Sequence, residues 1–232
     1  MTLTRRLSIR RNRRGIVRAL GEAVGGALAH VYHMEHDLVY LLEEVPSGGD
    51  VPPGNGLALR EVPADDALCW SPELRILPRV TAARFEQGAR RYAAIWKGQG
   101  VDVCWVVSGR CFHEQVDGFS LQLGPRDCYV FDYQGFRQGR PPAFGRFVLM
   151  KALVGFLIEE ENQRMGGRGR FYSVVDRRNR GSVYFHTRVL EARLTGTFRT
   201  RWLLGRPTIL LDGASPSIVV AQGNGQLHGR SS

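Results

Sequence analysis

A mixed α/β domain built around one central sheet is the fold class that this sequence predicts. Between residues 57 and 212, short apolar runs typical of strands alternate with stretches of helical periodicity. Glycine-containing turns separate several of these runs, which favours short strands joined tightly to their neighbours. The chain has 232 residues and is 43% hydrophobic, enough to bury the core of one domain and to argue against global disorder.

The first half of this region predicts three strands and a helix. A strand is expected at 57–62, followed by an irregular segment that becomes helical within 64–88. The runs at 91–97 and 101–107 flank Gly98-Gln99-Gly100, so they predict a β-hairpin. No internal repeat is visible.

The second half opens with a strand at 127–133 and the longest expected helix, at 144–163. Phe147, Met150, Val154 and Leu157 share one face of that helix. A strand at 170–175, a short helix at 182–190 and late strands at 199–204 and 208–211 follow, with one more short strand expected at 217–221. Up to the first of the late strands, the element order is therefore β-α-β-β-β-α-β-α-β.

The ends of the chain differ in composition from this region. Residues 1–46 predict a basic, helical N-terminal extension, because apolar residues recur at roughly helical spacing from Ile16 to Tyr32. Residues 47–56 are rich in Gly and Pro and predict a linker. The domain is expected at 57–212, and residues 213–232 predict a flexible tail.

The formal net charge of +10 indicates an anionic partner, such as a phosphorylated ligand, a membrane surface or a nucleic acid. Only Lys97 and Lys151 are lysines, so arginine supplies almost all the positive charge. Residues 1–20 hold seven arginines and no acidic residue, a pattern that fits an anionic membrane surface, RNA or a disordered extension. Aromatic residues in an RNA-binding pattern are missing, which makes a nucleic-acid partner the less favoured alternative.

Four cysteines show neither a CxxC pair nor a spacing typical of zinc ligands. We therefore expect reduced thiols, no metal and a cytoplasmic protein, with peripheral attachment to the inner face of the membrane through residues 1–20 as an extension of that hypothesis. Cys128 lies on the expected strand at 127–133. No histidine is placed beside it by sequence, so a buried core thiol is favoured over a nucleophile.

The segment most indicative of chemistry is the loop between this strand and the long helix. A glycine-bearing loop at the start of a helix exposes backbone N–H groups, which together with the positive end of the helix dipole favour an anion. Arg137, Arg140 and Arg146 add positive charge there. The pattern predicts a phosphate site, and the alternative is an arginine-rich loop at the start of a core helix.

A second polar segment follows the strand at 170–175. Asn179 precedes Ser182, which opens the next short helix. Asn179 is expected either to cap that helix with its side chain or to turn its amide toward a ligand that lies across the strand ends.

Residues 57–204 resemble the GNAT superfamily of acyl-CoA-dependent N-acyltransferases, especially bacterial members linked to polysaccharide or cell-surface pathways. In that family a loop reading approximately Arg-Gly-Arg-Gly-Ile-Tyr-Pro-Ala holds the pyrophosphate of acyl-CoA. The loop here matches it at Gly139, Pro142 and Ala143, whereas Phe136 replaces the first arginine. Asn179-Arg180-Gly181-Ser182 is similar to the family's Asn-x-x-Ala/Ser, and residues 84–94 are similar to its passage from helix to second strand.

The resemblance implies a GNAT-like twisted central sheet flanked by helices, and transfer of an acetyl or other acyl group from acyl-CoA to a primary amine by direct attack. The acceptor would be a small molecule or a sugar amine. Acyl-CoA would be held by the loop and by the asparagine: Arg137, Gln138, Gly139, Arg140, Ala143 and Asn179. Backbone N–H groups of Phe131, Asp132 and Tyr133 would serve as oxyanion donors.

Two side chains are expected to move protons. Glu114 is the first candidate for the general base, with Asp127 and Asp132 as alternatives. His186 stands seven residues past Asn179, where many members of the family carry a tyrosine that protonates the departing thiolate, so it is expected to be the general acid. The alternative to an enzyme is a catalytically inactive GNAT-like binding or scaffold domain, which the departures from the loop pattern favour.

Overall fold

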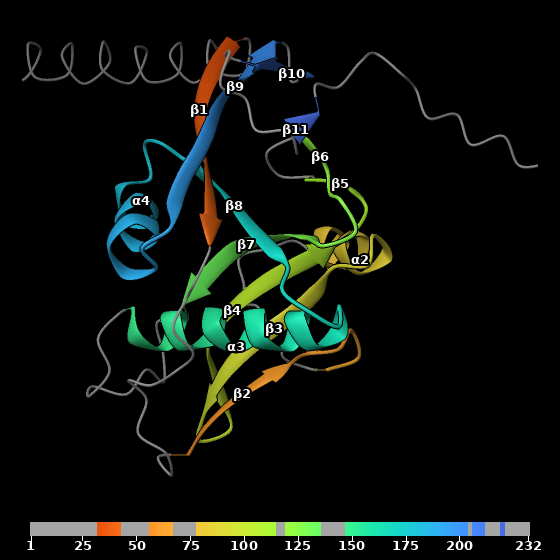
Figure 1. The fold of residues 1–232 in the computed structure, drawn as a ribbon, viewed down its shortest axis with the longest axis vertical. Coiled ribbons are helices and arrows are strands. Elements are labelled where there is room, and N and C mark those ends of the chain that lie inside the picture. The colour runs from red at the N-terminus through yellow and green to blue at the C-terminus, as the bar shows by residue number, and fades with distance from the viewer. Residues whose placement is uncertain are drawn as a thin grey trace, which may run out of the picture.

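An eight-stranded sheet forms the centre of the protein, with the strands in the spatial order β10-β9-β1-β8-β7-β4-β3-β2 (Figure 1). A computed structural model of the chain describes residues 32–42, 56–66, 78–114, 119–135, 147–203, 206–211 and 219–220. The strands of the large sheet are β1 (Tyr32–Leu42), β2 (Leu57–Glu61), β3 (Arg90–Trp96), β4 (Gln99–Ser108), β7 (Asp127–Gly135), β8 (Arg170–Asp176), β9 (Arg193–Leu203) and β10 (Arg206–Leu211). The predicted mixed α/β class, a large sheet flanked by helices, is confirmed.

Most elements expected between residues 57 and 212 are confirmed. The hairpin of β3 and β4 turns at Gly98, whose φ of 81° is a conformation that glycine adopts without strain. The helices are α2 (Pro78–Glu86), α3 (Val148–Arg164) and α4 (Arg180–Tyr184), and a π-helical turn, η2 (Phe185–Val189), continues α4. A second sheet has three strands: β5 (Cys111–His113), β6 (Ser120–Gln122) and β11 (Val219–Val220). Of these three strands, only β11 was expected from the sequence.

The N-terminal region is where the sequence-based prediction is wrong. Residues 32–42, expected to end a helical extension, form strand β1 in the interior of the large sheet, between β8 and β9. Leu38 pairs with Val175 of β8 on one side and with Thr197 of β9 on the other. The domain therefore includes residues from before the expected linker, and the boundary predicted at residue 57 does not separate it from an extension.

Several predicted segments lie outside the described residues: the first 31 residues, the linker apart from Gly56, the loop at 136–146, and the tail apart from β11. Among the described helices, none has the length and apolar character needed to cross a bilayer.

The two faces of the sheet carry different cores. On one face α3 covers β3, β4, β7 and β8 (Figure 1), and its Met150, Leu153 and Leu157 pack with Val106 and Val130. On the other face, aromatic side chains of β4, β7, β9 and the small sheet pack together: Trp105, Phe112, Phe119, Tyr129, Phe131 and Phe198. Strands buried on both faces read as continuous apolar runs, as β4 does in this sequence.

A buried carboxylate fixes α3 to the sheet. Glu161 of α3 has no exposed surface and accepts hydrogen bonds from Arg90 Nε at 2.7 Å and from Tyr92 Oη at 2.8 Å, both on β3. Because these donors satisfy the charge, the long helix is held in one register across the sheet.

Candidate active site

The site begins where two neighbouring parallel strands separate. Strands β7 and β8 pair only from Asp127 to Tyr129 and from Arg170 to Tyr172, within the part of the chain that the structure describes. Beyond these pairs the strands diverge toward their C-terminal ends, and the start of α3 lies at the same end of the sheet (Figure 1). We call the diverging residues, 130–135 of β7 and 173–176 of β8, the fork.

A bulge in β7 decides which side chains reach each face of the fork. Phe131 pairs with Trp105 and Gln134 with Val103, so that Asp132 and Tyr133 together oppose the single residue Cys104 of β4. Asp132 has a φ of 52°, which a bulge can accommodate. The extra residue reverses the alternation of β7, because Asp132 then follows Phe131 onto one face and Tyr133 reaches the other.

On the face of α2, three charged side chains form a buried cluster. Arg84 of α2 donates to Asp132 Oδ2 at 2.6 Å and to Glu114 Oε1 at 3.1 Å. Its guanidinium carbon lies 4.9 Å from the centroid of the Phe131 ring and 5.5 Å from that of Trp105, so the cation also packs on two aromatic faces. Burial lowers the pKa of Arg84, but Glu114 and Asp132 outweigh it and the pKa is raised overall.

The cluster argues against Glu114 as the general base. Its side chain is only 2% exposed and it is bound to a cation that stays charged, so it is poorly placed to take a proton from a ligand. Asp132 is 22% exposed, and its Oδ1 accepts a hydrogen bond from Gln134 Nε2 at 2.7 Å. Asp127 lies at the closed end of the fork, where Arg170 Nε donates to it at 2.7 Å. Of the three predicted carboxylates, Asp132 is therefore the one that lies in the fork with an exposed part.

On the opposite face, His186 of η2 is completely buried among polar and aromatic groups. Its Nδ1 lies 2.8 Å from the carbonyl oxygen of Ser182, and its Nε2 lies 2.9 Å from Ser173 Oγ on β8. A carbonyl oxygen can only accept, so Nδ1 carries the proton and Nε2 of the neutral ring accepts from the Ser173 hydroxyl. Tyr40 of β1 stacks on the imidazole with ring centroids 5.3 Å apart.

This environment argues against the predicted role of His186 as a general acid. Burial lowers its pKa to about 4, although the hydrogen bond to Ser182 favours the charged form. At neutral pH the ring is therefore uncharged, and Nε2 has no proton to donate to a leaving group. His186 instead orients the hydroxyl of Ser173.

The depressed pKa of His186 predicts a loss of stability in acid. In the unfolded chain the imidazole takes up a proton near its ordinary pKa of 6.5, whereas in the folded chain it resists protonation until about pH 4. Stability is therefore fully present above pH 6.5 and is lost as the pH falls toward 4, by about 3 kcal/mol in total. Urea unfolding of the unchanged protein and of His186→Gln across this range isolates the effect.

His113→Gln, at an exposed position, is the control for this measurement: it leaves His186 in place, so the loss of stability toward pH 4 is expected to remain. Equal pH dependence in the unchanged protein and in His186→Gln would contradict the assignment of a neutral, buried imidazole.

Asn179 caps the short helix that follows β8. Its Oδ1 accepts a hydrogen bond from the backbone N–H of Ser182 at 3.1 Å, which is the capping role that the sequence allowed. The remaining residues expected to bind acyl-CoA, Arg137, Gln138, Gly139, Arg140 and Ala143, lie outside the described residues, and their roles stay predictions.

Sequence reasoning missed Arg84, Ser173 and Tyr40 as parts of this site. A signal was present for Ser173, because it is the one polar residue within the apolar run Phe171–Val175. No local signal marks Arg84, since an arginine in the last turn of a helix is ordinarily solvated. Tyr40 reaches the site only because β1 enters the sheet.

Cys128 is a buried core thiol, as the sequence indicated. It has no exposed surface, its sulfur lies 3.9 Å from that of Met165, and burial raises its pKa to about 12. Among the described residues, no group of three or more His, Cys, Asp and Glu side chains could hold a metal ion.

Comparison with known proteins gives structural neighbours only. No protein-family model and no curated protein matches the sequence. One similar solved structure is a tandem GNAT protein from the clavulanic acid biosynthesis pathway, with a TM-score of 0.49, 16% identity and coverage of 85% of this chain and 59% of that one. A second is a GNAT-family acetyltransferase from Novosphingobium aromaticivorans, with a TM-score of 0.40, 12% identity and coverage of 72% and 63%. Both are GNAT proteins.

A third neighbour, an acetyltransferase from Clostridium acetobutylicum solved with acetyl-CoA, has a TM-score of 0.36 and 14% identity and covers 55% of this chain and 86% of that one. The first two neighbours belong to the family that the sequence resembles. The chain spans about three-fifths of the length of the first two structures, 59% and 63%.

Proposed function

We propose that this protein is an acyltransferase that moves an acetyl or other acyl group from acyl-CoA to a primary amine. The observation that carries the proposal is the fork, where parallel strands β7 and β8 part after three residue pairs. Strand ends that diverge in this way present backbone N–H and C=O groups to a ligand lying between them. An extended chain such as the pantetheine arm of CoA, which contains two amides, is a ligand of the matching chemistry.

The start of α3 supports a site for the phosphates of that ligand. No side-chain hydrogen bond caps α3 at Phe147, within the residues that the structure describes. The N–H groups in the first turn of a helix have no acceptor within the helix, and the helix dipole favours an anion there. The preceding loop carries the arginines and the glycine that the sequence singled out, Arg137, Arg140 and Gly139.

Asp132 is the carboxylate that we assign to the acceptor side. The bulge directs it to the α2 face of the fork, and Arg84 and Gln134 fix its orientation. In the proposed reaction the amine nitrogen attacks the thioester carbonyl carbon, the C–S bond breaks, and the ammonium proton leaves toward Asp132 directly or through water. Asp132 is already hydrogen-bonded to Arg84 at 2.6 Å and to Gln134 at 2.7 Å, and its exposed part lets it pass the proton on to solvent.

Titration of the purified protein with acetyl-CoA and with CoA tests this proposal. We expect micromolar affinity for both ligands, falling at least about tenfold in Gly139→Trp, because a bulky side chain would obstruct the backbone contacts expected for the pyrophosphate. Gln99→Trp, which places the same side chain in the exposed turn between β3 and β4, is the matched control and should bind as the unchanged protein does.

Release of free thiol from acetyl-CoA in the presence of a panel of amines then separates two functions. Amine-dependent release would support the enzyme. Binding of acetyl-CoA without release for any amine would favour the inactive GNAT-like binding domain, and absence of binding to either ligand would overturn the proposal.

A further inference from the structure

A buried hydroxyl without a hydrogen bond lies inside the fork. Tyr133 Oη is shielded from solvent and makes no hydrogen bond to any described residue. The ring is held edge-on by Phe185 and His186, with centroid distances of 5.7 and 5.3 Å. Native proteins leave few buried hydroxyls unpaired, because an unpaired hydroxyl keeps the full penalty of leaving water. The arrangement therefore indicates a partner that enters with a ligand.

The neighbouring Ser173 and His186 have their own protons engaged in other hydrogen bonds. Burial raises the pKa of Tyr133, and the nearby Ser173 hydroxyl offsets only part of this rise, since the two oxygens do not reach the geometry of a hydrogen bond. The proton of Ser173 is committed to Nε2 of His186, whose own proton is committed to the carbonyl of Ser182. With both protons engaged, the phenol O–H is the donor left over in this group for an incoming acceptor atom.

We propose that Tyr133 Oη donates a hydrogen bond to the carbonyl oxygen of the bound thioester, and that Ser173 and His186 are positioning residues for this donor. The inference rests on the proposed function and adds a side-chain donor to the backbone donors expected from the sequence. Tyr133 is the second residue of the bulge, on the strand that lines the fork. Negative charge develops on that oxygen as the amine attacks, so a fixed donor there stabilises the transition state.

The carbonyl oxygen is favoured over the sulfur as the acceptor. Burial raises the pKa of Tyr133 well above its ordinary value of 10.0, so the phenol holds its proton firmly. A group that retains its proton suits a hydrogen bond to an oxyanion better than proton transfer to a leaving thiolate.

Tyr133→Phe separates this role from a structural one. The substitution removes an unpaired hydroxyl and keeps the ring, so the melting temperature is expected to stay the same or to rise. Tyr92→Phe is the matched control, since Tyr92 Oη donates to buried Glu161 at 2.8 Å and its loss is expected to lower the melting temperature. A fall in the melting temperature of Tyr133→Phe as large as that of Tyr92→Phe would overturn the inference.

Ligand binding gives the second readout and requires no knowledge of the acceptor amine. CoA lacks the carbonyl, so Tyr133→Phe is expected to weaken acetyl-CoA binding about 3- to 10-fold and to leave CoA binding unchanged. The infrared C=O stretch of acetyl-CoA labelled with carbon-13 at the carbonyl should shift to lower frequency on binding to the unchanged protein. That shift should be lost in Tyr133→Phe, reduced in Ser173→Ala and retained in Tyr92→Phe.

Three results would count against the inference in different ways. Equal acetyl-CoA affinity and an unchanged stretch in Tyr133→Phe would overturn it while the proposed function stands. Absence of binding of acetyl-CoA and CoA to the unchanged protein would overturn the proposed function and the inference together. Acetylation of Ser173, detected by mass spectrometry after incubation with acetyl-CoA, would show that Ser173 is a nucleophile and not a positioning residue.

Discussion

Removal of residues 1–46 is expected to prevent the protein from folding. Strand β1 is hydrogen-bonded on both sides, to β8 and to β9, so its loss would split the sheet and leave each of these strands with one unpaired edge. Val39, Tyr40 and Leu42 are at most 2% exposed, and each such side chain stabilises the fold by about 1.5–3 kcal/mol when buried. The sum approaches the whole stability of an ordinary domain, roughly 5–15 kcal/mol.

The measurement compares three chains by circular dichroism and urea unfolding: the full chain, residues 32–232 and residues 47–232. The protein of residues 32–232 keeps β1 and is expected to unfold cooperatively, as the full chain does. The protein of residues 47–232 lacks β1 and is expected to show no cooperative transition. Addition of a peptide covering residues 31–46 to the third chain should restore the transition, because β1 pairs through its backbone. A cooperative transition in residues 47–232 at unchanged urea concentration would refute this placement of β1.

Replacement of Arg84 by methionine is expected to cost about 3–5 kcal/mol of stability, as typically happens when one partner of a buried ion pair is removed. Arg84 is 2% exposed and lies between Glu114 and Asp132, so its removal leaves two carboxylates close together without the guanidinium that joins them. Arg84→Met with Glu114→Gln is expected to recover part of the loss, since one of the charges is then also absent.

Arg60→Met is the matched control for Arg84→Met. Arg60 and Asp66 form an ion pair at 2.7 Å, but the arginine side chain is 42% exposed and water screens the pair. The loss expected there is below about 1 kcal/mol. Urea unfolding at neutral pH measures both variants, and a loss in Arg84→Met no larger than that in Arg60→Met would contradict the buried cluster.

Local patterns were sufficient where one segment carries its own signal. The β3–β4 hairpin was predictable because its glycine turn joins two apolar runs, and α3 because Met150, Val154 and Leu157 recur at helical spacing within a long run without proline. The position of the fork followed from the expected order of strand, loop and long helix. These features depend on contacts between residues near in sequence.

The residues that surround the fork depend on distant contacts and could not be read from the chain. Residues 37–42 of β1 are buried or half-buried on both faces and therefore lack the alternation that marks a strand, so their apolar run resembled the end of a helix. One extra residue in β7 exchanged the faces that Asp132 and Tyr133 occupy, and a bulge has no signature in sequence when neither residue is glycine.

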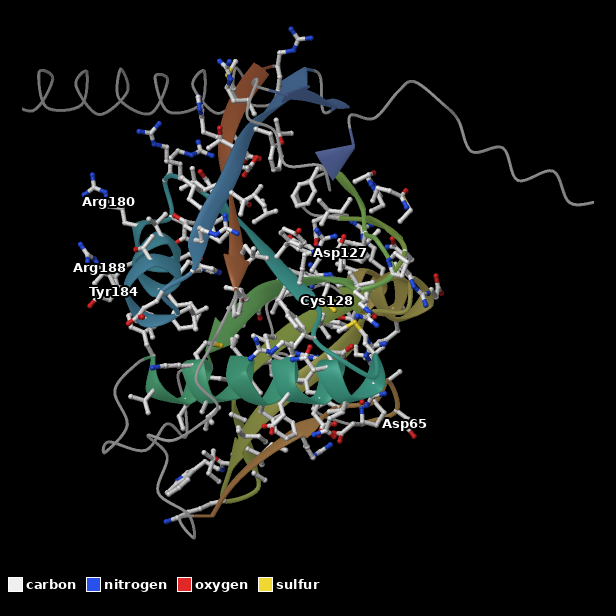
Figure 2. All side chains as sticks on the ribbon, viewed as in Figure 1. Asp65, Asp127, Cys128, Arg180, Tyr184 and Arg188 are labelled. Carbon is white, nitrogen blue, oxygen red and sulfur yellow. The ribbon has the colours of Figure 1, made fainter. Side chains whose placement is uncertain are left out.

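The sequence by itself determined the fold class, the place of the candidate site along the chain and the residue types available to it. The tertiary structure decided which of those side chains are buried, paired or exposed. Glu114 is held by Arg84, 30 residues away along the chain, and His186 is kept neutral by burial beside Ser173 and Tyr40. The physical reason is that ionisation and hydrogen-bond direction depend on burial and on partners brought together by the fold, and neither is a property of a segment alone. Figure 2 shows side chains from distant segments around the sheet: the labelled Asp127 and Cys128 lie near the middle of the view, and Tyr184 lies near the left edge of the molecule.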